Sequence, residues 1–250
     1  MINRACKNQV SGSSHLLARL RAWTSTGRRK MKHIRRRHSQ PSFLYRILPF
    51  DRLVELFEQR ELSLSRPSCW DDPYESSLAN EAFNSVFAQC WCRVGISDAM
   101  WRIYSPDRFS VRIKTTPMLL REQVGLALSD LDRFQWEISR VSYTSTTADL
   151  QSRLAQLRRS NDPKDAVRSL FTKRRAFKHE AEYRLAVFDS CAVANRDRLV
   201  IPVDPHALVL SVLADPRATD TMMQVFKFYL ESKLKFQGQV GKSQLYQGVS

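Results

Sequence analysis

The sequence predicts an α+β fold with a mixed or antiparallel sheet and interspersed helices, and three observations support this class. Segments with the two-residue alternation of strands and segments with the helical period follow one another without a regular strand–helix–strand repeat. Glycine is scarce, with 7 residues in 250, and no glycine-rich phosphate loop is present, which disfavours a Rossmann or P-loop nucleotide site. The 43% hydrophobic content is ordinary for a globular protein that buries one substantial core.

Positive charge is concentrated at the N-terminus. The formal net charge is +15, and residues 1–40 hold eleven Lys or Arg and no Asp or Glu, which leaves +4 for the rest. We expect residues 1–42 to form a basic, mostly disordered tail and residues 43–250 to form one α+β domain. The tail residues that could hold nucleic-acid phosphates are Arg28, Arg29, Lys30, Lys32, Arg35, Arg36 and Arg37.

Other interpretations of this tail stay open. It is a solvated extension in the simplest one, and Met31 could be the true start of the chain, just before the domain. Apolar residues at helical spacing between residues 16 and 23 could also form a short membrane-surface or targeting helix.

Strand alternation and proline positions predict the elements of the first half of the domain. Residues 43–48 form a strand, Pro49 opens a helix, and residues 61–65 alternate strictly as a second strand. A polar loop follows. Beyond it we expect a helix to about residue 84, a strand over 86–94, a helix over 98–104 and a strand over 109–114.

The second half mixes longer helical patterns with short strands. We expect a helix over 117–140, a short strand over 141–144, helices over 148–159 and 162–172, strands over 181–188, 199–203 and 208–214, and a last helix over 219–235.

The late strand carries a group of charged residues. Because residues two apart in a strand share a face, Glu180, Glu182 and Arg184 would line one surface. In open solvent this trio is an ordinary polar face with a weak ion pair. In a cleft the two carboxylates would shift each other's pKa, as acid/base sites require. The sequence leaves both interpretations open.

Two further motifs have a structural and a functional interpretation. Asp71 and Asp72 before Pro73 form a natural turn, and adding Glu75 gives a loop that could instead face a substrate or a divalent cation. Trp101 and Tyr104 lie three apart on a predicted helix, and this spacing favours core packing over a stacking wall for a ligand.

No metal site is predicted, because the five cysteines are scattered. Cys90 and Cys92 share a strand face, but no matching His or Cys pair follows them.

Four stretches, in order, resemble the landmarks of the bacterial family labelled domain of unknown function 2971. They are Leu44-Tyr45-Arg46, a serine strand running into Trp70-Asp71-Asp72-Pro73-Tyr74-Glu75, Met100-Trp101 with Tyr104, and Glu180-Ala181-Glu182-Tyr183-Arg184. The sequence departs from the family at Asp71, where an Asn is usual, and at Cys90-Trp91-Cys92, where the family tends to have Cys-Phe-Ser. This resemblance implies no established reaction.

A second resemblance is in the order of parts. An Arg on the first strand, a helix, a Ser on the second strand and a late Glu-x-Glu are similar to the arrangement of arginine-handling ADP-ribosyltransferases, whose sheets bind NAD without a Rossmann motif. By this resemblance Arg46 would contact the nicotinamide ribose or a phosphate. The other expected cofactor-binding residues are Tyr45, Ser63, Ser65, Trp101 and Tyr104.

The same resemblance implies catalytic roles for the late carboxylates. Glu182 would hold a ribose hydroxyl and stabilise the oxocarbenium-like charge as nicotinamide leaves, while Glu180 would orient or deprotonate the acceptor. Arg46 is the third expected catalytic residue.

The leading functional hypothesis is therefore NAD-dependent transfer of ADP-ribose to a macromolecule, in a toxin or phage-defence setting. Two alternatives stay open: a nucleic-acid-binding module that uses the basic tail without catalysis, and a metal-dependent nuclease that uses Asp71, Asp72, Glu75 and the late carboxylates. No stretch is apolar enough to span a membrane and no secretory signal is present, so we expect a cytoplasmic protein.

Overall fold

The computed structural model describes residues 42–70, 72, 75, 84–130, 132–144, 148–149, 151–152, 155, 159–160, 162–193 and 196–247. The predicted basic tail with its nucleic-acid residues lies outside the described residues, as do Asp71, Pro73 and Tyr74 of the acidic loop and much of the helices predicted before residue 84 and over 148–159.

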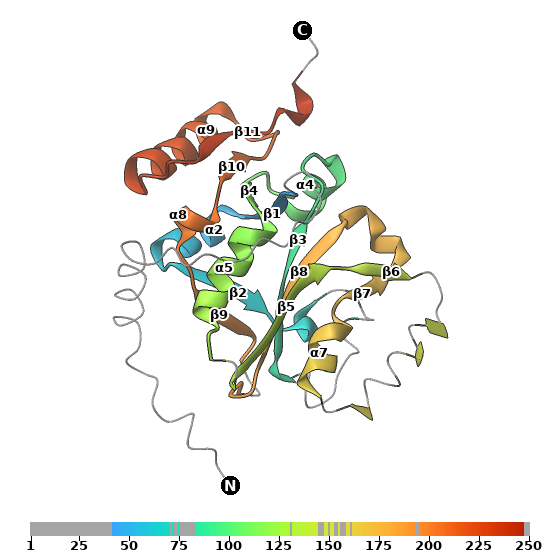
Figure 1. Cartoon of the computed structure of the whole chain (residues 1–250). Coiled ribbons are helices and arrows are strands. Elements are labelled where there is room, and N and C mark those ends of the chain that lie inside the picture. Colours follow the sequence, from blue (N-terminus) through green and yellow to red (C-terminus); the bar gives the residue numbers. More distant parts are fainter. Residues whose placement is uncertain are drawn as a thin grey trace, which may run out of the picture. The chain divides into compact units, whose positions relative to one another are not determined.

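Nine strands of the described chain form one mixed sheet (Figure 1). In chain order they are β1 (Leu44–Pro49), β2 (Glu61–Ser65), β3 (Val86–Cys92), β4 (Ser110–Thr115), β5 (Phe134–Arg140), β8 (Glu182–Asp189), β9 (Arg198–Pro202), β10 (Ser211–Ala214) and β11 (Gln239–Lys242). The order is β11-β10-β4-β1-β3-β2-β9, and β8 also pairs with β3 and carries β5 on its other side. The pairs are antiparallel except for β10 with β11, which is parallel. The predicted α+β class with a mixed sheet is confirmed.

A second, two-stranded parallel sheet lies beside the start of β8. It consists of β6 (Ser142–Thr144) and β7 (Thr172–Arg174). The backbone connects the two sheets, because the amide of Val141 donates to the carbonyl of Glu182 at 3.1 Å. This small sheet therefore fixes the β7 side chains next to the first residues of β8.

The helices begin where the sequence places caps and prolines. They are α2 (Phe50–Glu58), α4 (Asp98–Tyr104), α5 (Pro117–Ala127), α7 (Pro163–Ser169), α8 (Pro205–Leu208) and α9 (Asp220–Lys227), with a π-helical continuation at Phe228–Lys233 and 3₁₀ turns at Pro67–Cys69, Arg175–Glu180 and Gln244–Tyr246. The side chains of Ser97, Thr116 and Thr219 accept the N-terminal amides of α4, α5 and α9, and proline occupies the first position of α5, α7 and α8. No helix of the described residues is long and apolar enough to cross a membrane.

Both faces of the central strands are covered by apolar side chains. Leu185 and Val187 of β8 join the larger cluster, which also includes residues of α2, α5 and α9. Ala186 joins a smaller cluster formed with Val86 and with Val167 of α7. The strand pair β3–β8 is thus buried on two sides, so a polar side chain at its end enters a partly desolvated environment.

The structure corrects four predicted elements. The helix predicted over 117–140 ends at Ala127, because the Asp130 carboxylate accepts the amides of Asp132 and Arg133 in a turn, and the chain then forms β5. The helix predicted over 162–172 is shorter, and Thr172 already belongs to β7. The strand predicted over 208–214 is divided between α8 and β10, and β11 was not predicted.

The fourth correction concerns Glu180. The sequence predicts this residue on the strand, but it ends the 3₁₀ turn Arg175–Glu180, and β8 begins at Glu182. Between them Ala181 takes a left-handed backbone conformation with φ of 44°.

Candidate active site

The main sheet divides along one side of β3. This strand pairs with β8 over its whole length, but on its other side it meets β2 only where Ser65 faces Ala88 and β1 only where Tyr45 faces Cys92. Between these two points the Arg46 guanidinium donates to the carbonyl of Cys90 at 3.1 Å. We call this sparsely paired side of β3 the seam. Neighbouring residues of a strand point to opposite faces of the sheet, so Arg46 and Tyr45 start on opposite faces, and the Arg46 side chain passes through the seam.

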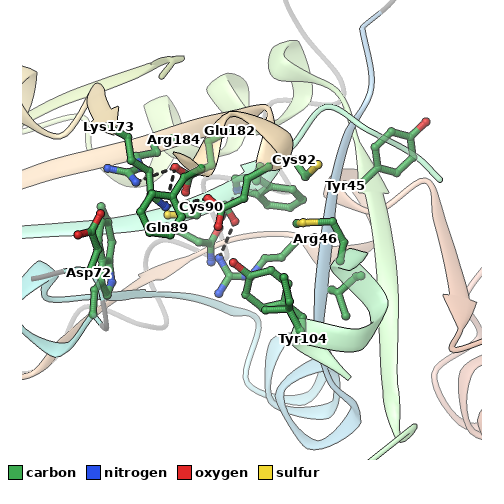
Figure 2. A pocket seen from close by; sticks show the side chains of 18 of the residues that line it. Tyr45, Arg46, Asp72, Gln89, Cys90, Cys92, Tyr104, Lys173, Glu182 and Arg184 are labelled. Carbon is green, nitrogen blue, oxygen red and sulfur yellow. Dashed lines mark hydrogen bonds and ion pairs between the residues drawn. The ribbon is translucent and has the colours of Figure 1, made fainter. Parts of the chain in front are cut away.

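A cavity of about 530 Å³ lies over the seam (Figure 2), a size typical of sites for small ligands and cofactors. It brings together most of the described residues that the sequence singled out: Tyr45, Arg46, Ser65, Trp70, Asp72, Glu75, Tyr104, Glu180, Glu182 and Arg184. In Figure 2, Lys173, Arg184 and Glu182 lie together at one end and Tyr45 lies at the other.

The first end is a cluster of buried charges around Lys173. Its ammonium lies 2.7 Å from Glu180, 3.3 Å from Glu182 and 3.8 Å from Glu75, and only 8% of the side chain is exposed. Lys173 comes from β7 of the small sheet, whereas Glu180 and Glu182 flank Ala181 at the start of β8 and Glu75 comes from a distant part of the chain. We call Glu75, Lys173, Glu180, Glu182 and Arg184 the acidic cluster, because its three carboxylates outnumber its two cations.

Arg184 is the second cation of the acidic cluster and its side chain is fully buried. Its guanidinium contacts Glu75 at 2.5 Å and Glu182 at 2.7 Å, and it donates to the carbonyl of Leu170 at 2.6 Å. It also lies 4.8 Å from the centre of the Trp70 ring, which is a cation–π contact. These contacts offset the large desolvation cost of a buried cation.

The pKa values of two carboxyl groups in the acidic cluster, Glu75 and Glu182, are shifted in opposite directions. Burial opposes the ionisation of Glu182, but Arg184 and Lys173 outweigh it and lower the pKa of this carboxyl below its ordinary value. Burial raises the pKa of Glu75, although the same two cations act against it. Of these two carboxyls, Glu182 stays ionised to lower pH and Glu75 takes up a proton at higher pH.

Three neighbours fix the position of Glu182. Its backbone amide donates to the hydroxyl of Tyr143 at 2.8 Å, and its carbonyl accepts the amide of Val141. The Cys90 side chain hydrogen-bonds the Glu182 carboxylate, and burial raises the pKa of this thiol well above its ordinary value, so it remains a neutral donor. Both cations contact atom Oε2 of Glu182.

The cavity also holds two guanidinium groups of a different kind, Arg46 beside the carbonyl of Cys90 and Arg112 beside the ring of Tyr45. Neither Arg46 nor Arg112 forms an ion pair with a carboxylate of the described chain, and burial lowers the pKa of both. The Arg112 guanidinium lies 5.0 Å from the centre of the Tyr45 ring. Both groups remain cations at neutral pH, because arginine does not deprotonate in proteins.

Two of the predicted cofactor-binding residues do not line the cavity, and a third, Ser65, lines it but bonds another side chain of the protein. Trp101 is 1% exposed and packs in the protein interior, so it forms no stacking wall, whereas Tyr104 is 43% exposed and lines the cavity. Ser63 does not line the cavity, and its backbone carbonyl accepts a hydrogen bond from the side-chain amide of Gln89. The Ser65 hydroxyl accepts the Trp70 indole N–H at 2.9 Å, which positions the ring under Arg184.

The sequence interpretation missed Lys173, Arg112 and Tyr143. Strand alternation could have identified Arg112, since it lies between the buried Val111 and Ile113 and must face the opposite side of β4. No local pattern marks Lys173, because its neighbours Arg174 and Arg175 suggest an exposed basic run.

The described residues contain no group of three or more His, Cys, Asp or Glu suited to a metal ion. The carboxylates that the nuclease hypothesis requires contact protein cations instead: Asp72 pairs with Arg174 at 2.7 Å, and Glu75 with Arg184. Asp71, the third carboxylate of that loop, lies outside the described residues, so the metal-dependent nuclease stays a prediction.

Comparisons with known proteins give a limited likeness. No family model matches the chain, so membership of the domain of unknown function 2971 family stays a prediction, and no curated protein matches it either. Among solved structures, it is similar to Thermus sp. 2.9 DarT in complex with NAD+, with 12% identity, a TM-score of 0.39, and coverage of 83% of this chain and 98% of that one. It is also similar to the same DarT in complex with ADP-ribosylated ssDNA, with 11% identity, a TM-score of 0.42, and coverage of 84% and 98%. Likenesses at these scores assign no activity to this chain, so any function must be argued from the cavity.

Proposed function

We propose that this protein is an NAD-dependent ADP-ribosyltransferase that acts on a macromolecule. The observation that carries the proposal is that one cavity joins an ionised, fixed carboxylate, Glu182, to the Arg46 guanidinium in the seam and to the exposed ring of Tyr104. These are the groups that cleavage of a nicotinamide–ribose bond needs at one place: a negative charge, an anion-binding cation and an aromatic surface.

The net charge of the acidic cluster suits the leaving group. At a pH where Glu75 is ionised as well, although burial raises its pKa, the three carboxylates exceed the two cations by one negative charge in a largely buried place. The nicotinamide ring of NAD carries one positive charge until the bond to ribose breaks. Burial of that ring beside the acidic cluster would balance the excess charge in a medium where water screens little.

Glu182 would act on the ribose as the bond breaks. Nicotinamide leaves with the electron pair of the C–N bond, and positive charge develops on the ribose carbon, as in glycoside cleavage. Because Arg184 and Lys173 hold Glu182 ionised and Tyr143 fixes its backbone, the carboxylate needs no reorganisation to stabilise that charge.

Glu180 would act on the acceptor. Its carboxylate contacts the Lys173 ammonium at 2.7 Å and also lines the cavity. An acceptor nucleophile forms the new bond to the ribose carbon and loses one proton, which Glu180 takes up. The products are then the ADP-ribosylated acceptor, nicotinamide and a proton returned to solvent.

The test is incubation of the purified protein with radiolabelled NAD and a mixture of protein, RNA and DNA acceptors. We expect label transfer, or at least nicotinamide release, that Glu182→Gln loses by about a hundredfold or more, the size of effect seen when one electrostatic stabiliser is removed. Glu122→Gln is the matched control, because Glu122 is exposed on α5 and outside the cavity.

Two outcomes separate the hypotheses. Equal turnover by wild type and Glu182→Gln would exclude the proposed role of Glu182. No turnover and no NAD binding by the wild type would exclude the enzyme and favour the non-catalytic nucleic-acid-binding module.

A further inference from the structure

Glu180 is poorly placed to keep a proton or to give it to bulk water. Its oxygen Oε2 forms the shortest carboxylate contact of the Lys173 ammonium, at 2.7 Å, and protonation of Glu180 would weaken that contact. The residue is also only 7% exposed, so bulk water has little access to its carboxyl group. A proton that Glu180 takes from an acceptor therefore has to move on to another group before the next turnover.

His179, the preceding residue, has the access to water that Glu180 lacks. It is exposed, and it lines the same cavity as Glu180. Both residues belong to the 3₁₀ turn Arg175–Glu180, which directly follows β7 and ends at the left-handed Ala181. His179 is thus an exposed titratable group next in the chain to the buried carboxylate, and the reaction described above gives it no role.

A hydrogen bond within the turn sets which imidazole nitrogen of His179 is basic. Atom Nδ1 lies 3.2 Å from the backbone carbonyl oxygen of Ala176. A carbonyl oxygen only accepts hydrogen bonds, so this contact places the proton of the neutral ring on Nδ1. Atom Nε2 then carries the free electron pair, and no hydrogen bond to a described residue occupies it. The turn therefore presents Nε2 as a proton acceptor.

No carboxylate of the described residues holds the imidazolium that a proton on Nε2 would form. The turn packs against β6 and β7, and the charged or titratable side chains of the turn and these strands, besides His179, are Tyr143, Lys173, Arg174, Arg175, Lys178 and Glu180. Glu180 is the one carboxylate in this set, and its Oε2 contacts Lys173. His179 forms no ion pair within the described part of the chain, so an imidazolium there is free to pass its proton to water.

We propose that His179 carries the acceptor's proton from Glu180 to solvent. The nucleophilic atom of the acceptor forms its bond to the ribose carbon and loses its proton to Glu180. The proton then passes to Nε2 of His179, which becomes an imidazolium and releases the proton to water. Glu180 is ionised again and recovers its full contact with Lys173. The inference rests on the proposed function for the transfer reaction, and His179 acts through Glu180 without contacting the substrate.

The test measures nicotinamide release and label transfer from NAD by wild type, His179→Gln and Lys178→Gln. Lys178→Gln is the matched control, because Lys178 is exposed in the same turn and does not line the cavity. We expect His179→Gln to lower kcat by about a hundredfold, the lower end of the range for a proton-transfer group, with KM for NAD within about twofold of wild type. Lys178→Gln should keep the wild-type kcat and KM.

Chemical rescue separates proton transfer from a structural role of His179. Free imidazole in the buffer can take the proton from Glu180 in place of the missing side chain. The rate of His179→Gln should therefore rise with the concentration of imidazole, and a series of substituted imidazoles should rescue better as their basicity increases. Wild type and Lys178→Gln should not respond to these bases, and a misfolded or displaced turn would not be repaired by them.

Failure of this inference differs from failure of the proposed function. An unchanged kcat in His179→Gln, or a lowered kcat that imidazole does not restore, would overturn the relay and leave the transferase standing. A raised KM with an unchanged kcat would show that His179 binds a substrate, which also overturns the relay. Absence of nicotinamide release by wild type would exclude the transferase itself, and the relay with it.

Discussion

Replacement of Lys173 by methionine should destabilise the protein in a strongly pH-dependent way. Lys173 is 8% exposed and lies within 4 Å of three carboxylates, at 2.7, 3.3 and 3.8 Å. Methionine has a similar length but no charge, so the acidic cluster would change from an excess of one negative charge to an excess of two. Removal of one member of a buried ion pair typically costs about 3–5 kcal/mol, and we expect Lys173→Met to fall in this range at pH 8.

The direction of the pH dependence follows from the carboxylates. In the variant, Glu75 and Glu182 would lose an attractive charge that lowers their pKa, so the pKa values of these two carboxyls in the folded state would rise. A carboxyl whose folded pKa is raised destabilises the fold fully above that folded pKa, and the effect fades as the pH falls to the ordinary pKa of the unfolded chain. The loss of stability should therefore shrink as the pH falls, because a carboxyl with a raised pKa takes up a proton in the folded variant. A tenfold change in the acid dissociation constant of that carboxyl corresponds to about 1.4 kcal/mol of recovered stability.

Urea unfolding of wild type and variant at pH 5 and pH 8 measures this difference. Lys178→Met is the matched control, because Lys178 is exposed in the same segment and should change stability by less than about 0.5 kcal/mol. A loss below about 1 kcal/mol at pH 8, or an equal loss at both pH values, would show that the acidic cluster is not held by Lys173 as described.

Two further predictions concern Glu182. Because the cations lower its pKa in the folded protein, Glu182 contributes stability that is present above its ordinary pKa of 4.5 and is lost as the pH falls through the lowered value. Glu182→Gln should therefore be less stable than wild type at pH 7 but lose less stability on acidification. Urea midpoints of the two proteins that run parallel from pH 7 to pH 3 would contradict this. Tyr143→Phe removes the acceptor of the Glu182 amide and should cost about 1–3 kcal/mol in urea unfolding, with faster hydrogen exchange at that amide; unchanged exchange would show that the bond does not protect it.

Local patterns predicted the fold where a segment had one clear period. The strand over 61–65 and the helix over 98–104 have the same bounds in the structure as β2 and α4, and Pro49 precedes α2 as expected. The failure to predict β5 has a physical reason. Phe134, Trp136 and Ile138 alternate as a strand, but the apolar residues of the sequence keep a helical spacing up to the Asp130 turn, where the helix has already ended. A single carboxylate that accepts two amides decided the boundary, and periodicity does not contain that information.

The candidate site was predictable only where its residues lie on one strand or in one motif. Strand alternation related Glu182 to Arg184, and both line the cavity together with Arg46. Alternation also placed Glu180 with them, and it lines the same cavity, but through the 3₁₀ turn and the left-handed Ala181 and not through a strand face. Lys173 was not predictable, because its partnership depends on how the β6–β7 sheet packs beside β8, which is a long-range property.

The two ends of the cavity differ in how their charge is balanced, and this difference bears on how a ligand would bind. At the acidic cluster the protein supplies both signs, so the excess charge is small and the carboxylates are fixed before any ligand arrives. Arg46 and Arg112 also line the cavity, and neither forms an ion pair with a carboxylate of the described residues, so an anionic group of a ligand could balance either charge. Electrostatic attraction of an anionic ligand would therefore come from these arginines, whereas discrimination at the reacting bond would come from the acidic cluster.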